Sequence, residues 1–563
     1  MEKLVLEKYN RWLNSSFLSK KEKEELESIK SDEKEITERF IADLEFGTAG
    51  LRGVMAMGTN RMNIHVIRHA SQGLAQYLLE EEKHPSVAIA YDSRNNSELF
   101  AKEAAATLAA NGIKVHIFNR LMPVPTLSFA VRVLKCSAGI VITASHNPRI
   151  YNGFKVYGND GCQMTIDAAN KVLANINKLD MFDDIKRMTF EKGIEEKLIE
   201  YISDEVVEKY YASVLSQSVK KPAESPRILN VTYTPLHGAG YIPVTTVLDR
   251  DGFKHIDIVE EQRLPDGDFT TCPYPNPEIK EAMDLGMKLM LKNKNDILVA
   301  TDPDSDRAGV AVNQNGEAII LTGNEIGILL FDFIYTARKE TGRMPKDPIV
   351  VKSIVSSDLV DLMGKEYGVN VINILTGFKF IGEQILFLER KNETQRFIFG
   401  FEESYGYLTN PDVRDKDGVN AMLLICEMAN YYKHKGLTLL DRLNQLYDKF
   451  GHYKTATLSF EFAGLEGKDK MQSLMKRFRE ESFKPELGEV EYVGDYKLGK
   501  IFYPDHEEET HLPKSDVIKF FLKDHETIIF RPSGTEPKLK AYIFANGDAR
   551  LAHYKELMAK LMK

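Results

Sequence analysis

The sequence has few cysteines, no long apolar run and no excess of basic charge. Its 563 residues include 4 cysteines, and none lies in a CxxC pair or in another spacing typical of a metal site. We therefore expect buried, reduced thiols, as in cytosolic proteins. No apolar run approaches the ~18 residues of a membrane span, and the charged beginning lacks the apolar centre of a signal peptide. These absences predict a cytoplasmic protein that does not enter a membrane.

The charge balance argues against nucleic acid as a main partner. Lysine and arginine total 74 against 83 acidic residues, and the resulting net charge of -9 repels polyanions. The histidines show no metal-binding spacing, because His506 and His511 in HEEETH do not match the HExxH pattern. We expect both to be surface residues. Hydrophobic residues make up 43% of the chain and charged residues 28%, a composition that can bury sizeable cores.

The length and the order of the apolar segments predict four domains. The chain is several times longer than one domain of about 100–200 residues. After surface helices in the first 45 residues, short β-branched runs alternate with amphipathic helices in three successive blocks, which is typical of βαβ units around mixed sheets. The last block changes to strands and a hairpin, which predicts a smaller α+β domain. The first boundary is placed at the end of a helix, shortly before a linker-like stretch at 216–227. The predicted domains are 1–205, 206–324, 325–450 and 451–563.

Three aspartates follow a predicted buried strand in the stretch DILVATDPDSDR: Asp302, Asp304 and Asp306. Carboxylates held so close repel one another without a cation, and oxygen ligands favour Mg²⁺, Mn²⁺ or Ca²⁺ over zinc. An EF-hand is excluded, because Arg307 and Asn313 stand where its glycine and glutamate are required. The alternative is a solvated turn, since aspartate and proline are common turn residues.

A second signal is the apolar strand GIVITA, which delivers Ser145 into a polar loop that begins with His146. Active sites of α/β sheets lie at the carboxyl ends of strands. A serine needs activation or prior phosphorylation to do chemistry, and His146 or Lys155 offers proton transfer or positive charge. Taken alone, a Ser-His pair favours an ordinary loop, because adjacent residues rarely face one another as a catalytic pair must.

A donor-rich turn, RPSGTEPKLK, lies between two apolar strands. Arg531, Ser533, Thr535 and the backbone around Gly534 form this turn, and Lys540 adds positive charge, a combination that suits a phosphate. The stretch is neither a Walker A loop nor a dinucleotide fingerprint. A plain hairpin turn is the alternative interpretation.

A fourth polar loop, GFEESYG, follows another predicted strand. Glu402 offers acceptor oxygens and Ser404 a hydroxyl, which together suit the hydroxyl groups of a sugar. By itself the loop is equally typical of a strand that ends in charged residues.

Taken together and in this order, the four segments resemble the α-D-phosphohexomutase superfamily, the phosphoglucomutases and phosphomannomutases. The resemblance covers nearly the whole chain and includes FGTAGLRG with Arg52, TGFKFIGE with Thr376 and Gly377, and VRDKDG with Lys416. One hypothesis thus explains the serine, aspartate, sugar and phosphate loops at once. The resemblance implies an α/β fold with four domains around a central active-site cleft. Three would be similar α/β domains with mixed sheets, and the fourth a smaller C-terminal α+β domain.

The resemblance also implies a mechanism, that of a phosphosugar mutase. Ser145 would carry a phosphate and would hold one Mg²⁺ per subunit together with the three aspartates. A sugar monophosphate would attack this phosphoserine, and the resulting glucose 1,6-bisphosphate would return its other phosphate. Arg307 and nearby lysines would neutralise charge. For proton transfer the sequence offers His146, Lys155 and Lys416 and does not choose among them. The implied substrate contacts are Arg52, Thr376, Gly377, Glu402, Ser404, Arg531, Ser533, Gly534, Thr535 and Lys540.

The sugar is predicted from the loop around Glu402. Family members with a GEES loop tend to be glucose-specific, and the extra phenylalanine in GFEES resembles a branch that also contains phosphopentomutases and glucose-1,6-bisphosphate synthases. We predict a phosphoglucomutase, with phosphomannomutase, phosphopentomutase or sugar bisphosphate synthase activity as alternatives. A non-catalytic phosphosugar-binding paralogue and a metallophosphatase are the other rival hypotheses. The expected partner is a small phosphosugar, without nucleic acid or membrane, and the expected assembly is a monomer or dimer.

Overall fold

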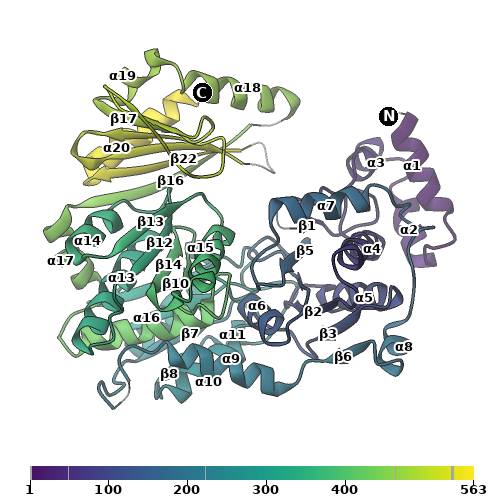
Figure 1. Cartoon of the computed structure of the whole chain (residues 1–563), viewed down its shortest axis with the longest axis horizontal. Coiled ribbons are helices and arrows are strands. Elements are labelled where there is room, and N and C mark those ends of the chain that lie inside the picture. Colours follow the sequence, from purple (N-terminus) through teal and green to yellow (C-terminus); the bar gives the residue numbers. More distant parts are fainter. Residues whose placement is uncertain (1–2, 48–49, 222, 463, 534–537, 563) are drawn as a thin grey trace. The chain divides into compact units, whose positions relative to one another are not determined.

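The computed structural model describes residues 3–47, 50–221, 223–462, 464–533 and 538–562. The chain forms two compact units, and it passes between them several times (Figure 1). Unit 1 contains Met1–Leu321, Ile381–Thr394 and Tyr405–Gly436. Unit 2 contains Thr322–Phe380, Gln395–Ser404 and Leu437–Lys563.

Unit 1 begins with three helices: α1 (Lys3–Asn14), α2 (Lys20–Ser28) and α3 (Glu33–Phe40). Their apolar side chains form a small core of their own, in which Trp12 meets Phe40 and Phe182 edge-on at ring-centroid distances of 5.8 and 5.3 Å. The helices predicted for this segment are therefore present. They bury an apolar face instead of lying loosely on the surface.

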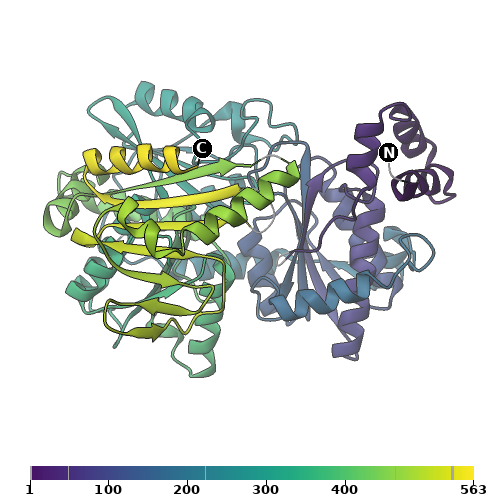
Figure 2. The ribbon, with the colours of Figure 1, turned by 90° about the horizontal axis from the view of Figure 1, so that it is seen from above.

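The first sheet of unit 1 is mixed, with strand order β1-β5-β4-β2-β3-β6. β2, β3, β4 and β6 run parallel, whereas β5 pairs antiparallel with both β4 and β1. Helices lie on both sides of this sheet (Figure 2). The strands are β1 (Gly50–Val54), β2 (Ser86–Tyr91), β3 (Lys114–Ile117), β4 (Ala138–Ile142), β5 (Tyr151–Gly158) and β6 (Ile199–Tyr201). The helices are α4 (Ile64–Glu81), α5 (Ser97–Ala110), α6 (Val124–Val133), α7 (Ile166–Ile176) and α8 (Phe190–Glu195).

The second sheet of unit 1 has the order β11-β10-β9-β7-β8, with β7, β8 and β9 parallel and the β9–β10–β11 meander antiparallel. The buried strand predicted before the aspartates is β9. The strands are β7 (Val231–Thr234), β8 (Ile256–Ile258), β9 (Ile297–Thr301), β10 (Ala308–Gln314) and β11 (Glu317–Leu321). The other elements of unit 1 are α9 (Asp204–Ser216), α10 (Tyr241–Arg250), α11 (Glu260–Arg263), α12 (Lys280–Asn293), β15 (Gly406–Leu408) and α16 (Gly418–Lys433).

The structure corrects the sequence interpretation of the stretch between the first two sheets. Residue 206 lies in the first turn of α9 and not at the end of a helix. The linker-like segment after α9 is also held in place, because Arg227 is buried and its guanidinium contacts Asp251 at 2.5 Å and Glu427 at 2.7 Å. Sequence composition marked this segment as a connection, but it did not reveal that a buried ion-pair network fixes it.

Unit 2 contains a third sheet in which β12 lies between β13 and β14, all parallel. These strands are β12 (Ile349–Ser353), β13 (Asn370–Ile374) and β14 (Phe397–Glu402). The helices around them are α13 (Gly323–Glu340), α14 (Leu359–Tyr367) and α17 (Leu439–Phe450), with the short η1 (Thr394–Arg396) before β14. α15 (Phe378–Arg390) begins in unit 2 and continues into unit 1.

The rest of unit 2 is an antiparallel seven-stranded sheet with order β16-β22-β21-β20-β17-β18-β19. Helices α18 and α20 pack on one face (Figures 1 and 2), where their apolar side chains join the core of the sheet. The strands are β16 (Tyr453–Glu461), β17 (Val490–Asp495), β18 (Lys500–Phe502), β19 (Glu507–Glu509), β20 (Ile518–Leu522), β21 (Thr527–Pro532) and β22 (Lys538–Asn546). The helices are α18 (Gly464–Arg477), η2 (Glu481–Phe483), α19 (Lys484–Leu487), η3 (Lys523–His525) and α20 (Asp548–Leu561).

Three predictions made from the sequence can be compared with the structure. All four cysteines are free and buried, as expected. Among the described residues, no helix combines the length and the apolarity that crossing a bilayer requires. His506 and His511 are both exposed, which confirms that HEEETH is a surface segment.

Candidate functional site

The connection between β4 and β5 presents Ser145 in a constrained backbone conformation. Its φ of 52° lies in the left-handed region, which residues other than glycine adopt rarely and at a cost of about 1–3 kcal/mol. The backbone N–H of Ser145 donates to Thr143 Oγ1 at 2.8 Å, and the side chain is buried, with the residue 3% exposed. The loop therefore holds the serine hydroxyl in one defined position.

The turn between β9 and β10 gathers the three aspartates. One carboxylate oxygen from each lies within 4.8 Å of the others, and all three residues are buried. Asp302 Oδ1 accepts hydrogen bonds from the backbone N–H groups of Asp306 at 3.1 Å and Arg307 at 3.0 Å. A solvated turn, the alternative that the sequence left open, is wrong for these buried side chains.

Backbone hydrogen bonds from separate segments of unit 1 fix the aspartate turn. Val124 N donates to Asp304 O at 2.9 Å, and Gly418 N donates to Ser305 O at 3.1 Å. A side chain at Gly418 would not fit, because its Cβ would lie 2.5 Å from Ser305 O. The turn is thus held rigidly, as a set of converging charges requires.

The serine loop and the aspartate turn meet. The Ser145 hydroxyl donates to Asp302 Oδ2 at 2.8 Å, although the two residues are 157 positions apart. The serine loop and the aspartate turn, which are far apart in the sequence, therefore belong to one site in unit 1.

Two lysines face the carboxylates. Lys155 Nζ lies 3.1 Å from Asp304 Oδ2, and Lys416 Nζ lies 3.1 Å from Asp306 Oδ2. The Arg307 guanidinium instead contacts Glu278 Oε1 at 2.5 Å. The positively charged residues suggested by the sequence therefore lie at the site, and the two lysines form ion pairs with the aspartates.

The three buried carboxylates of the site carry more negative charge than the two lysines can neutralise. Burial raises the pKa of Asp302 well above its usual value, and the charges of Asp304 and Asp306 raise it further. Burial likewise raises the pKa of Asp306. Burial acts on Asp304 in the same direction, but Lys155, the hydrogen bond with Asp302 and the charge of Lys416 together outweigh it and hold the pKa of Asp304 below its usual value. Keeping all three groups ionised needs more positive charge than the lysines supply.

The donor set fits a hard divalent cation. Asp304 Oδ1 and Asp306 Oδ1 are buried and have no hydrogen-bond partner in the described part of the chain. Buried acceptors without a partner are costly, and a bound cation would satisfy them. With carboxylate oxygens as ligands and no cysteine or histidine among them, the group suits Mg²⁺ better than zinc.

His146 also lies beside the serine. Its Nδ1 is 3.2 Å from Ser145 Oγ. Burial lowers the pKa of His146 well below its usual value, and the charges of Arg307 and Arg52 lower it further. The imidazole is therefore neutral at pH 7, and it can exchange a hydrogen bond with the serine hydroxyl.

Sequence reasoning missed Arg94, which clamps the serine loop. Its Nη2 donates to Ser145 O and Asn147 O, and its Nη1 donates to Pro148 O at 3.0 Å and Tyr151 O at 3.3 Å. The guanidinium is buried and lies 4.9 Å from the ring centroid of Phe269. One side chain thus fixes most of the loop.

Asp92 and Thr143 link this clamp to the aspartates. The Thr143 hydroxyl lies 2.6 Å from Asp92 Oδ2 and 3.1 Å from Asp304 Oδ2, and Arg94 Nε lies 3.3 Å from Asp92 Oδ2. A usable signal existed in the sequence, because YDSR follows β2 and parallel β2 and β4 end at the same edge of the sheet.

Asp415 is a second residue that sequence reasoning missed. Its Oδ1 lies 3.1 Å from Lys416 Nζ, and its Oδ2 accepts from the Tyr157 hydroxyl at 2.8 Å and from Gln163 Nε2 at 3.0 Å. Lys416 therefore lies between two carboxylates, those of Asp306 and Asp415. The motif VRDKDG contained the signal, since two acids flank this lysine.

The predicted sugar loop belongs to unit 2. Glu402, the last residue of β14, is buried and accepts a hydrogen bond from Gly377 N at 2.6 Å, so two of the predicted contact segments meet. Thr376 Oγ1 is buried without a hydrogen-bond partner among the described residues, and Ser404 is half-buried. These groups form a small polar surface at the carboxyl end of β14.

The predicted phosphate turn also belongs to unit 2, between β21 and β22. Arg531, Ser533 and Lys540 are half-buried, and Arg531 Nη1 lies 3.4 Å from the Tyr542 hydroxyl. Desolvation raises the pKa of Glu403, and the positive charges of Lys540 and Arg531 oppose that rise. The cations of this turn thus act on the residue next to Glu402.

The last three residues predicted to contact the substrate are Gly534, Thr535 and Arg52. Gly534 and Thr535 lie outside the described residues. Arg52, on β1 in unit 1, is exposed, and its Nη1 donates to Asn147 Oδ1 at 3.1 Å, which places it beside the serine loop.

Three family models match the chain in the order of its sheets. They are phosphoglucomutase/phosphomannomutase alpha/beta/alpha domains I, II and III, which match residues 43–182, 208–316 and 322–450. A curated phosphoglucomutase of Staphylococcus haemolyticus is 37% identical over 514 residues, which cover 90% of this chain and 91% of that protein.

Solved structures of low sequence identity share the fold. The open form of the Paramecium protein pp63/parafusin, a phosphoglucomutase, superimposes with a TM-score of 0.69 at 19% identity and covers 92% of this chain and 95% of that one. A phosphoglucomutase/phosphomannomutase family protein from Burkholderia thailandensis gives a TM-score of 0.66 at 17% identity, with coverages of 92% and 96%.

Proposed function

Because this chain belongs to the phosphoglucomutase/phosphomannomutase family, the α-D-phosphohexomutases, we propose that it interconverts glucose 1-phosphate and glucose 6-phosphate. It is a mutase of the isomerase class with three α/β domains and a fourth, sheet-rich domain. The observation that carries the proposal is the contact between the Ser145 hydroxyl and Asp302 within a buried group of three carboxylates.

Ser145 is proposed to carry the transferred phosphoryl group. In the first half-reaction a sugar hydroxyl attacks the phosphorus of phosphoserine, so that the new sugar O–P bond forms as the Ser145 Oγ–P bond breaks. The product is glucose 1,6-bisphosphate, and the serine oxygen takes up a proton. In the second half-reaction Ser145 Oγ attacks the other phosphate, so that the Oγ–P bond forms as the sugar O–P bond breaks. The proton lost by Ser145 is balanced by the one that the released sugar oxygen takes up, and the phosphoserine is regenerated. The net reaction moves phosphate between the two ends of the sugar.

Asp302, Asp304, Asp306 and the oxygen of Ser145 are proposed to hold one Mg²⁺. The ion would supply positive charge to the phosphoryl oxygens during transfer. The residues of the chain supply the rest of the environment. Arg94 fixes the loop of Ser145, and the aspartate turn orients the carboxylates.

Lys155, His146 and Lys416 are the candidates for moving protons between sugar hydroxyl and serine oxygen. Lys155 is 8% exposed and is held by Asp304, and His146 touches Ser145 Oγ. Lys416 contacts Asp306, the aspartate that follows Asp304 in the turn. We propose Lys155 as the general acid and base, because it lies on β5, which leads directly away from the serine loop.

Recognition of the sugar and of its second phosphate is proposed to involve different loops. Carboxylate and hydroxyl suit neutral sugar hydroxyls, which assigns them to Glu402 and Ser404 with the Thr376–Gly377 turn beside them. Guanidinium, ammonium and hydroxyl groups suit phosphate, which assigns it to Arg531, Ser533, Thr535 and Lys540, with the backbone of Gly534. Arg52 is proposed as a further phosphate contact.

The sugar is tested by a coupled assay across glucose, mannose, glucosamine and ribose 1-phosphates, with and without catalytic glucose 1,6-bisphosphate. The highest kcat/KM is expected for glucose 1-phosphate, because curated relatives at 37% identity are named phosphoglucomutases. A preference for mannose or ribose 1-phosphate would assign the alternative activities. Release of inorganic phosphate without mutase turnover would indicate a phosphatase and contradict the proposal.

Phosphorylation of Ser145 is tested directly by intact mass and peptide mapping of the purified protein. We expect partial occupancy at Ser145 and loss of mutase turnover in Ser145→Ala. Phosphate found only elsewhere would contradict the mechanism. A cytoplasmic location also remains a proposal, supported by four buried, free cysteines.

A further inference from the structure

Glu403 lies between Glu402 and Ser404 of the proposed sugar loop, and the end of the neighbouring strand β12 holds its carboxylate. Glu403 Oε2 accepts hydrogen bonds from the Ser353 hydroxyl at 3.1 Å and from the Ser356 hydroxyl at 3.3 Å. The Ser356 oxygen in turn accepts from the backbone N–H of Glu403 at 3.1 Å. Because β12 and β14 run parallel, their carboxyl ends meet at one edge of the sheet. These hydrogen bonds therefore fasten the sugar loop to the connection between β12 and α14.

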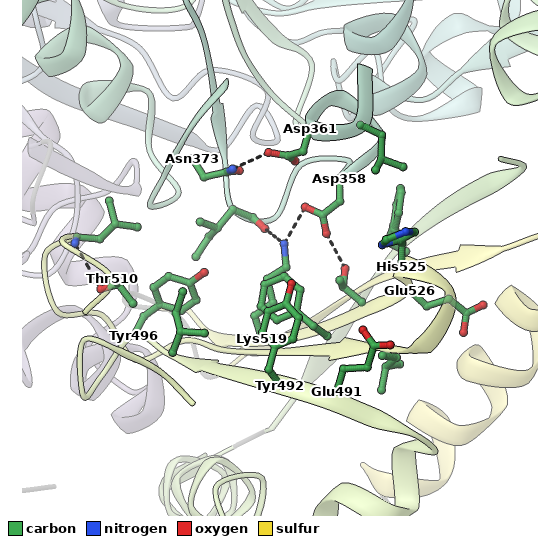
Figure 3. A pocket seen from close by; sticks show the side chains of 18 of the residues that line it. Asp358, Asp361, Asn373, Glu491, Tyr492, Tyr496, Thr510, Lys519, His525 and Glu526 are labelled. Atoms are coloured by element: carbon green, nitrogen blue, oxygen red, sulfur yellow. Dashed lines mark hydrogen bonds and ion pairs between the residues drawn. The ribbon is translucent and has the colours of Figure 1, made fainter. Parts of the chain in front are cut away.

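The connection between β12 and α14 is itself fixed to the seven-stranded sheet. Lys519 on β20 donates to the backbone oxygen of Ile354 at 3.2 Å and to Asp358 Oδ1 at 2.8 Å. The Thr527 hydroxyl donates to Asp358 Oδ2 at 3.0 Å. Figure 3 shows Asp358 and Lys519 facing one another in the wall of a cavity of about 410 Å³ between α14 and this sheet. Lys519 is buried, so salt screens this ion pair little, and the connection keeps its place on the sheet.

The cations of the predicted phosphate turn lie on the sheet face that meets this connection. Tyr542 on β22 belongs to the same apolar cluster as Ile354. Because side chains alternate between the two faces of a strand, Lys540, two positions before Tyr542, lies on the same face. Arg531 is the cross-strand partner of Lys540, and its Nη1 lies 3.4 Å from the Tyr542 hydroxyl. Both cations therefore belong to the side of the sheet on which Glu403 is held.

Arg531 and Lys540 are like charges placed directly opposite one another on neighbouring strands, an arrangement that destabilises a sheet. A nearby carboxylate relieves this repulsion. Burial raises the pKa of Glu403, whereas the hydrogen bond from Ser353 and the charges of Lys540 and Arg531 act in the opposite direction. Burial raises the pKa of Tyr542 as well, and the charge of Glu403 raises it further. The Glu403 carboxylate therefore offsets part of the positive charge that the two cations offer to a phosphate.

We propose that Glu403 is a positioning residue that holds the sugar loop through Ser353 and Ser356, and that its charge limits the affinity of the phosphate turn for anions. The inference rests on the proposed function, because it concerns the same substrate site. In that function the bisphosphate must present its other phosphate to Ser145 before the second half-reaction. A phosphate held too tightly in the turn would leave it slowly, so a limited affinity favours turnover.

Glu403→Gln separates the charge from the hydrogen bonds, because an amide oxygen can still accept from the two serine hydroxyls. Binding of glucose 1-phosphate and mannose 1-phosphate is measured by calorimetry at pH 8 in the Ser145→Ala background, where no turnover is expected. We expect both ligands to bind about threefold more tightly, because a negative charge near the cations is removed. A residue with only a structural role would give weaker or unchanged binding, and either result would overturn the proposal.

Two further substitutions complete the test. Glu366→Gln is the matched control at an exposed glutamate of α14 that pairs with Lys449, and it should leave both affinities unchanged. An equal gain in this control would mean that any lost negative charge suffices, against the proposal. Ser356→Ala keeps the charge of Glu403 but removes hydrogen bonds of the loop. In the enzyme with Ser145 intact, it should lower the ratio of kcat/KM for glucose and mannose 1-phosphates about fivefold. Ser353→Ala should lower the ratio less, and an unchanged ratio in both serine variants would contradict the positioning role.

Arg531→Ala, measured in the same calorimetric series, separates failure of this inference from failure of the proposed function. Weaker glucose 1-phosphate binding in Arg531→Ala, without tighter binding in Glu403→Gln, would overturn the inference alone. Unchanged binding in Arg531→Ala would show that the turn does not hold phosphate, and both would then be wrong. In the double variant Glu403→Gln/Arg531→Ala, the gain from Glu403→Gln should be smaller than in the single variant, because one of the two cations is gone. An equal gain would contradict the proposed charge balance.

Discussion

At the scale of single residues, the site is decided by a few side chains that constrain one serine. Ser145 combines a left-handed backbone conformation with a hydroxyl held by Asp302. Such strain persists only where the surroundings over-determine it, and Arg94 supplies that restraint through carbonyls on both sides of the loop. The position of the serine hydroxyl therefore depends on Asp302 and Arg94.

Lys155→Met is expected to lower kcat by at least about a hundredfold, the lower end for loss of a general acid or base, with a smaller change in KM. Initial rates over a range of glucose 1-phosphate concentrations separate the two effects. The variant should still become phosphorylated when treated with glucose 1,6-bisphosphate over long times. Near-normal kcat with only a raised KM would make Lys155 a phosphate contact and move the proton role to His146 or Lys416.

Arg94→Met is expected to lower kcat by about a hundredfold, because misplacing a reacting atom by about 1 Å has an effect of that size. Arg94→Lys should recover part of the loss, since one ammonium can still bond some of the loop carbonyls. Arg149→Met is the control, because Arg149 lies in the same loop with an exposed side chain. Kinetics and circular dichroism are measured together, and a fully active, folded Arg94→Met protein would show that the clamp is dispensable.

At the scale of secondary-structure elements, hairpins and strand ends carry the chemistry. The β4–β5 connection presents the serine and the β9–β10 turn presents the aspartates. Both elements lie in unit 1, and backbone hydrogen bonds from the first residues of α6 and α16 hold the aspartate turn. In unit 2 the end of β14 and the β21–β22 hairpin carry the proposed sugar and phosphate contacts.

The aspartate turn is expected to bind one Mg²⁺. Chelation with EDTA should abolish turnover and added Mg²⁺ should restore it, and calorimetry should give one site per chain. Asp304→Ala should remove this site, because it deletes a ligand and leaves Lys155 unpaired. Asp268→Ala, at an exposed carboxylate outside the turn, is the control. Full activity of metal-stripped Asp304→Ala would refute the assignment.

Substitutions in the sugar loop and in the phosphate turn of unit 2 should have different effects on the kinetics. Glu402→Gln is expected to change the ranking of sugars, because it alters an acceptor for sugar hydroxyls. Arg531→Ala should raise KM for all phosphosugars alike by about 10–100-fold, the loss expected for a charged hydrogen bond. The kcat/KM values of four sugar phosphates decide the matter, with Lys523→Ala as a control at an exposed lysine. The proposed roles would be wrong if Glu402→Gln raised KM for all phosphosugars alike and Arg531→Ala changed the ranking of sugars.

At the scale of the whole molecule, two units with separate cores should not unfold as one. Trp12 is the only tryptophan in the chain, and it is buried among the N-terminal helices of unit 1. Its fluorescence therefore reports on the N-terminal core of unit 1, whereas far-UV circular dichroism reports on both units. We expect the two denaturation curves not to coincide, because chains of several domains usually depart from two-state unfolding.

The control for this prediction is Trp12→Phe, which should remove the fluorescence transition. It should leave the part of the dichroism curve that belongs to unit 2 unchanged. Superimposable curves from both probes would mean that the units unfold cooperatively, against the expectation from their separate cores.

Much of this site was predictable because its parts are local patterns. An apolar strand followed by polar residues predicted the position of Ser145, and three alternating aspartates predicted the turn after β9. The alternation of β-branched runs and amphipathic helices predicted mixed α/β sheets. The stretch with Arg94 follows a strand end, but Arg94 was missed because its role depends on carbonyls more than fifty positions away. The rigid linker around Arg227 was missed for the same reason.

The sequence by itself determined the order of the segments, their secondary structure and the chemical groups that each one brings. Only the tertiary structure decided which groups meet: Ser145 with Asp302, Lys155 with Asp304, and Lys416 with Asp306. The physical reason is that helix and strand periodicity depend on neighbours a few positions apart, whereas ion pairs across a site depend on how sheets and turns pack. The cavity of unit 2 likewise arises only where one face of its sheet meets α14.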